Sequence, residues 1–183
     1  MLKKIIFIGF CMQVGLAMAH VTLEQASAPV NSMYKAVLRV GHGCDGSPTT
    51  GLRVQLPPGF QGAKPMPKPG WTVTTRSEKL AKPYETHGRL VTEEVVEIQW
   101  NANQRDAWLA DAHYDEFIVR GRLPNTAGAI WFKVLQTCAT GQLDWSQIPA
   151  SGSDPRGLKT PAARLDVEPL QHKPGSKTHG QHH

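Results

Sequence analysis

His20 stands out in this sequence because of the residues that precede it. It directly follows Ala-Met-Ala at positions 17–19, and small residues of this kind are what a signal peptidase requires before its cut site. The upstream segment supplies the rest of a secretory signal, with Lys3 and Lys4 as its positive start and residues 5–16 as its apolar stretch. The sequence therefore predicts a signal peptide over residues 1–19.

Two alternatives to a cleaved signal peptide, a transmembrane anchor and a lipoprotein, fit this segment less well. The apolar stretch is shorter than the roughly 20 residues that a transmembrane helix needs. Phe10 before Cys11 is too bulky for lipoprotein processing. We therefore expect cleavage after Ala19 and export to the periplasm, with His20 as the first residue of the mature protein.

A histidine at a free N-terminus carries two nitrogen donors, the α-amine and the ring Nδ1, which can close a chelate ring on one metal ion. The α-amine loses its proton far more readily than a lysine does, so binding costs little. Nitrogen donors in such an arrangement suit Cu(II), which stands at the top of the divalent affinity order. The following residues, 20–25, alternate like a strand and would hold the amine against a sheet. We therefore expect His20 to bind copper.

The cysteines indicate an oxidising compartment. Cys11 leaves with the signal peptide, so the exported chain keeps Cys44 and Cys138. The simplest use of such a pair is a disulfide, which would stabilise the fold by roughly 4 kcal/mol in the chain-entropy model. The alternative is that both act as thiolate metal ligands.

Composition excludes several function classes. The whole chain has 20 Lys and Arg, 15 Asp and Glu, and a formal net charge of +5, which falls to +3 once Lys3 and Lys4 are removed. This mild excess is spread along the chain and gives no footprint for nucleic acid. Beyond the signal peptide the sequence contains no second apolar run long enough to predict a membrane span. No catalytic triad, carboxylate pair or phosphate-binding glycine loop is evident, so we expect a protein that is not an enzyme.

The rest of the chain must position these residues. Its alternating and β-branched segments, separated by Pro and Gly, predict strands. Short, evenly spaced strands of this kind predict an all-β, Greek-key antiparallel β-sandwich of the immunoglobulin or cupredoxin type over residues 20–170. Residues 57–70 and 101–114 are expected to be loops, the second with room for a helical turn. The expected strands lie at 20–25, 34–40, 51–56, 71–77, 93–100, 115–123 and 129–138.

Hydrophobic residues thin out after about residue 148, and the chain ends in a histidine-rich segment of low complexity. Residues 171–183 cannot bury enough apolar surface to offset their ordering entropy, so we expect them to be disordered. Their histidines either bind metal loosely or are simply solvated. They are His172, His179, His182 and His183.

Several motifs in order resemble the YcnI-type copper-binding domain, formerly a domain of unknown function, in its Gram-negative form. They are AHVTLEQ at the cleavage site, YKAVLRV, GHGCDGSPTT, KPMPKPGW, HYDEF and LQTCATGQLDWSQIPA, and they span roughly residues 20–150. The resemblance implies an extracytoplasmic β-sandwich that binds Cu(II) through a histidine brace. In that brace the N-terminal histidine corresponds to His20, and a tryptophan packed near the metal corresponds to Trp145.

The third ligand of the resembled site departs from the pattern. Gram-positive relatives have a glutamate in the second strand, and the matching place here falls at or beside Tyr34, where no carboxylate stands. Glu24 follows His20 in the same strand but lies about 13 Å away along an extended chain. The other candidates can reach the metal only through the fold. They are Asp115, Glu116, His42 and His113.

Four functions compete on this evidence. The first is a periplasmic Cu(II)-binding protein for copper trafficking or homeostasis, working with other periplasmic or membrane copper-transport proteins. The second is a histidine-brace copper oxygenase, which needs a second imidazole from His42, His87 or His113. The third is a blue-copper carrier, which the sequence disfavours because no histidine or methionine follows Cys138 in reach. The fourth is a metal-free adhesion or scaffold sandwich.

Overall fold

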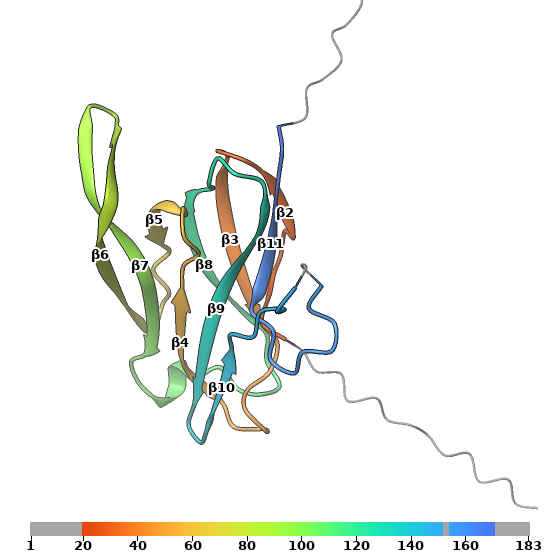
Figure 1. Ribbon diagram of the computed structural model, residues 1–183. Helices are drawn as coiled ribbons and strands as arrows, with labels where there is room; N and C mark the ends of the chain where they lie inside the picture. Colours follow the sequence, from red (N-terminus) through yellow and green to blue (C-terminus); the bar gives the residue numbers. More distant parts are fainter. Residues whose placement is uncertain (1–19, 152–153, 171–183) are drawn as a thin grey trace, which may run out of the picture.

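Two β-sheets face each other in the computed structural model, which describes residues 20–151 and 154–170 (Figure 1). The smaller sheet has the strand order β1-β3-β8-β5, and the larger has β2-β11-β9-β4-β7-β6, with β10 paired to β9. The smaller sheet contains β1 (Thr22–Leu23), β3 (Met33–Val40), β8 (Asp115–Arg122) and β5 (Gln61–Pro65). The larger contains β2 (Ser27–Pro29), β4 (Thr49–Gln55), β6 (Trp71–Thr86), β7 (Arg89–Ala102), β9 (Gly128–Cys138), β10 (Gln142–Trp145) and β11 (Ala163–Glu168).

This architecture confirms the predicted all-β sandwich. The ladders are antiparallel except where β2 runs parallel to β11. No helix in the described part of the chain is long and apolar enough to cross a membrane. The expected signal peptide, residues 1–19, and the expected disordered tail, residues 171–183, lie outside the described residues.

Alternating side chains from both sheets form the core. In β3 and β9 every second residue is buried, as expected for strands with one face turned to the opposite sheet. Trp100 is fully buried, and its ring meets Phe117 of the facing sheet edge-on at 5.7 Å between centroids. Large aromatics therefore supply much of the burial between the two layers.

Four strands lie where the sequence predicted none, namely β2, β5, β10 and β11. Residues 61–65, expected to be loop, form β5 at the edge of the smaller sheet. An edge position tolerates the Pro65 that ends the strand, since its missing N–H is not needed there. β10 lies just before residue 148, and β11 lies after it, where few hydrophobic residues were expected, yet Leu165 of β11 is fully buried.

The hairpin β6–β7 is longer than the strands predicted at 71–77 and 93–100, and its outer half projects away from the sandwich (Figure 1). Glu94 ties the arm to β5, because its carboxylate accepts hydrogen bonds from the Gly62 N–H and the Tyr84 hydroxyl. The expected loop 101–114 carries a single 3-10 turn at Arg105–Ala107.

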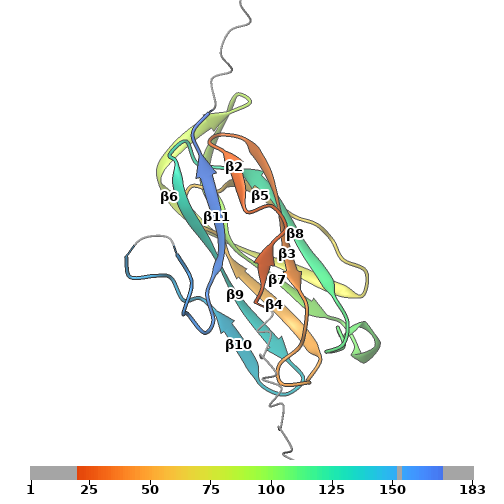
Figure 2. The same cartoon turned by 90° about the vertical axis from the view of Figure 1, so that its right-hand side faces the viewer.

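The turned view shows which loops share one end of the molecule (Figure 2). The β9–β10 hairpin and the connection from β3 to β4 lie together at the end opposite the tip of the β6–β7 arm (Figures 1 and 2). These two connections carry Trp145 and His42 of the candidate site, and His20 lies just before β1.

Candidate metal site

Trp145 ends β10 and points its indole into the sandwich. Its backbone pairs with Val134 of β9, and its side chain is only 2% exposed. A buried indole N–H needs an acceptor, and Trp145 Nε1 donates to the side-chain oxygen of Gln136 at 3.0 Å. The indole is therefore held in one orientation by β9.

Gln136 is buried, and both the nitrogen and the oxygen of its side-chain amide form hydrogen bonds. Its Nε2 donates to the backbone oxygen of His42 and to the hydroxyl of Thr49, both at 2.7 Å. Its Oε1 accepts from Trp145, as described above. Because every group of this buried amide has a partner, the network links Trp145 rigidly to the loop that carries His42.

Two histidine rings lie against this indole. The His20 ring meets Trp145 in a T-shaped contact with centroids 5.6 Å apart, and the His42 ring does the same at 6.2 Å. Both histidines are half-buried, whereas Trp145 is buried. The fold therefore gathers the predicted residues His20 and Trp145 at one place and adds His42 to them.

The loop that presents His42 is a tight hairpin. Cys44 and Ser47 exchange backbone hydrogen bonds at 2.9 Å around an Asp-Gly turn, in which Asp45 and Gly46 have φ of 48° and 81°. Positive φ at both central residues is the type I′ arrangement, for which Asp-Gly is well suited. Gly43 has no room for a side chain, because a Cβ there would lie 1.9 Å from the Ser47 oxygen. Its N–H donates to the Asp111 carboxylate at 2.9 Å.

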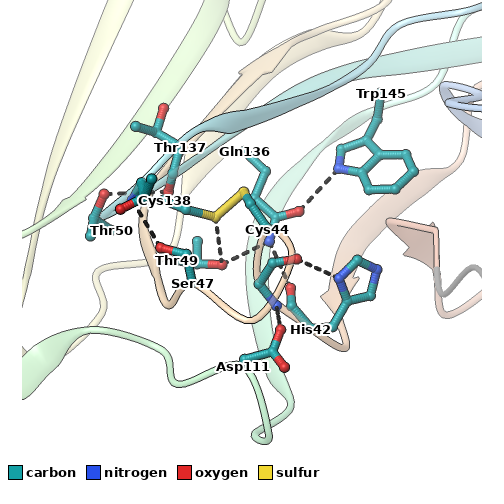
Figure 3. The surroundings of a disulfide bond; sticks show 12 residues. His42, Cys44, Ser47, Thr49, Thr50, Asp111, Gln136, Thr137, Cys138 and Trp145 are labelled. Carbon is teal, nitrogen blue, oxygen red and sulfur yellow. Dashed lines mark hydrogen bonds between the residues drawn. A yellow bond between two sulfur atoms is a disulfide. The ribbon is translucent and has the colours of Figure 1, made fainter.

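The predicted disulfide joins this loop to the end of β9. Cys44 and Cys138 are bonded across a sequence separation of 94, two residues after His42 and two after Gln136 (Figure 3). The alternative use of these cysteines as thiolate metal ligands is therefore wrong. The bond holds the His42 loop and the Gln136 strand together from the side away from Trp145 (Figure 3).

The other candidate ligands are either engaged with other residues or exposed. Asp115 forms an ion pair with Lys68 at 2.6 Å, and Glu116 accepts a hydrogen bond from Tyr114. Glu24 and His113 are exposed. Of the two candidate histidines His42 and His113, His42 alone makes a ring contact with the indole among the described residues.

Tyr34, at the place where relatives carry a glutamate, has a different task. Its ring is 2% exposed, and its hydroxyl donates to the Gln25 oxygen at 2.6 Å. Burial, followed by the nearby charge of Glu24, raises the pKa of Tyr34 to about 12. The phenol thus stays protonated near neutral pH and fastens the segment after β1.

The potential donors that lie against the Trp145 indole are the ring nitrogens of His20 and His42. No group of three or more His, Cys, Asp or Glu side chains placed to hold a metal occurs within residues 20–151 and 154–170. Two imidazoles beside the indole are present, and cleavage before His20 would add its α-amine as a third donor. Such a set fits Cu(II), which favours nitrogen ligands in planar arrangements.

Gln136 is the residue that sequence reasoning missed. The signal was present, because strand alternation places it on the same inward face as Phe132 and Val134. A glutamine in an otherwise apolar inward row indicates a buried hydrogen-bond network. Asp111, which caps the His42 loop from a distant part of the chain, had no comparable signal.

Replacing Gln136 with methionine tests this network. The change keeps the approximate volume but leaves the indole N–H of Trp145 and the hydroxyl of Thr49 without their partner. We expect the free energy of unfolding in urea to fall by about 1–3 kcal/mol. Copper affinity should fall about tenfold, since groups that orient ligands contribute on that scale.

The matched control is Gln55→Met, at an exposed position of β4. It should change stability by less than about 0.5 kcal/mol. Equal stability and copper affinity in Gln136→Met and the parent chain would show that the network does not position the site.

Comparisons with known proteins agree with the fold. A family model described as "Domain of unknown function (DUF1775)" matches residues 20–167. The chain is similar to a solved structure titled "Crystal structure of an uncharacterized protein from Nocardia farcinica reveals an immunoglobulin-like fold", with a TM-score of 0.62 and 24% sequence identity. The match covers 81% of this chain and 97% of that one. No curated protein matches.

Proposed function

The chain belongs to the YcnI-type family, whose model is described as a domain of unknown function (DUF1775), and we propose that it is a periplasmic Cu(II)-binding protein. In this proposal a signal peptidase removes residues 1–19 and frees the α-amine of His20. The amine and ring of His20 then bind copper beside Trp145. The biological role is copper trafficking or homeostasis.

The observation that carries the proposal is the contact between His20 and Trp145. A histidine that became N-terminal by chance would have no reason to lie against a buried, hydrogen-bonded indole 125 residues further along the chain. The half-buried position of His20 leaves its ring open to an arriving ion. The disulfide fits the oxidising compartment that the proposal requires.

The indole favours holding copper over activating oxygen. Trp145 fills space next to both rings and offers no lone pair to a metal, because the nitrogen of an indole is a donor only, and its N–H is bonded to Gln136. An apolar wall of this kind shields one side of a bound ion from water and from oxygen. Reduction would favour release, since Cu(I) prefers softer ligands than nitrogen and oxygen. Release on reduction suits a protein that hands copper to a membrane or periplasmic partner.

One observation keeps a second function in view. A histidine-brace oxygenase requires two imidazoles and an amine on one copper ion, and His42 lies where a second imidazole would be needed. The two functions differ in whether the bound ion has a coordination position open to oxygen. We favour the binding protein because the buried indole lies against both rings, where it would obstruct such a position.

Titration of the processed chain with Cu(II) tests the proposal. We expect one tightly bound ion per chain in competition with a chelator that strips weak sites. With ascorbate and oxygen, the copper-loaded protein should make no more hydrogen peroxide than copper held by the chelator. Absence of a tight ion would refute the copper function, whereas sustained peroxide production would favour the oxygenase.

A further inference from the structure

We propose that His42 supplies the second imidazole to the copper ion bound by His20, replacing the carboxylate that the family pattern expects. This inference rests on the proposed copper function and names a ligand within the same site. It makes the donor set one amine and two neutral imidazoles.

The first support is position. His20 precedes β1 and His42 follows β3, and the antiparallel pairing of these strands places both rings against the same indole. Strand pairing thus brings the two residues to the same end of the sheet, where one ion could contact both half-buried rings. The remaining histidines in the described residues, His87 and His113, are exposed, and His87 lies at the turn of the β6–β7 arm.

The second support is the tautomer of His42. Its Nδ1 lies within hydrogen-bond distance of the Gly43 backbone oxygen, which can only accept, so Nδ1 carries the proton (Figure 3). The neutral ring then has its lone pair on Nε2, on the other side of the ring. A hydrogen bond from one ring nitrogen to a backbone carbonyl is the usual way in which proteins orient a metal-binding histidine.

The third support is the shell that holds His42 still. Its backbone oxygen accepts from Gln136 at 2.7 Å, and the next residue, Gly43, donates to Asp111 at 2.9 Å. The disulfide at Cys44 fixes the loop two residues further on. The loop is thus restrained at three successive residues. Because it is already ordered, little conformational entropy is lost when its imidazole binds a metal ion.

The fourth support is that two carboxylates already have partners. Asp115 is paired with Lys68, and Asp111 accepts the Gly43 N–H. Turning either toward the indole would break an existing charge-assisted contact. His42 needs no such exchange, because its Nε2 has no hydrogen-bond partner among the described residues.

Electron spin-echo spectroscopy of the Cu(II)-loaded chain that starts at His20 tests the inference, because it counts the imidazoles bound equatorially to copper. We expect two in the parent chain and one in His42→Ala and His42→Phe, with copper affinity lowered at least about 10- to 100-fold. His42→Phe keeps an aromatic ring against Trp145, so a loss of copper binding in this variant cannot be attributed to lost packing. The control His87→Asn should leave both readouts unchanged.

A further variant, with the four tail histidines changed to alanine, removes imidazoles outside the site and should still show two. A tight ion with a single imidazole in the parent chain, or unchanged spectra in both His42 variants, would overturn the inference while leaving the copper function intact. Absence of any tight ion in the parent chain would overturn both.

Discussion

One additional residue ahead of His20 is expected to abolish tight copper binding. The extension turns the α-amine of His20 into an amide, which is no longer a basic donor, while leaving the imidazole and the sandwich in place. We expect the affinity for Cu(II) to fall by at least about 100-fold, since loss of a mere ligand-orienting group already costs about 10- to 100-fold. Chelator competition on the two chains, followed by the copper absorption band, measures the difference.

The control for this experiment is His20→Ala with a free N-terminus, which keeps an amine but loses the ring. It should lose the tight site as well, because neither donor alone closes the chelate. Weak binding by the histidine-rich segment at residues 171–183 is removed by changing its histidines to alanine. Equal affinity in the extended and processed chains would exclude the brace.

Removing the Cys44–Cys138 disulfide is expected to have the largest effect on stability. The bond closes a loop of 94 residues, for which the chain-entropy model gives roughly 4–5 kcal/mol. We expect the double change of both cysteines to serine to lower the free energy of unfolding by about that amount, as measured by urea denaturation. Copper affinity should fall about tenfold, because the His42 loop loses its attachment to β9.

Stability and binding are separated by measuring affinity well below the unfolding midpoint, where far-ultraviolet circular dichroism shows the sheet intact. The matched control is reduction of the parent chain, which breaks the same bond without changing a residue. A folded double variant with undiminished affinity would show that the disulfide stabilises the sandwich but does not position His42.

The strands that alternate strongly were predictable from the sequence, and those that depend on partners were not. Residues 34–40 and 129–138 correspond to β3 and β9 to within a residue, since each buries every second side chain. β5 is short, lies at an edge and contains Gly62 and Pro65, so its identity comes from pairing with β8. β11 alternates apolar and charged residues and buries every second one, so a local strand pattern was present there and was missed, whereas its place between β9 and β2 comes from the fold.

The candidate site divides in the same way. His20, Trp145 and the cysteine pair were identified from local motifs, and the disulfide is confirmed. The contact of His42 with Trp145 depends on the folding of β3 and β10 into different sheets, so spacing alone gave no preference for it over Glu24, Asp115, Glu116 or His113. Copper binding by any of them stays a prediction.

Anomalous diffraction at the copper edge, from crystals of the processed and copper-loaded chain, tests the central claim most directly. We predict one strong peak beside the Trp145 indole, bonded to the amine and the ring of His20. A sole peak elsewhere on the molecule, or a copper ion beside Trp145 that is not bonded to the His20 amine, would contradict it.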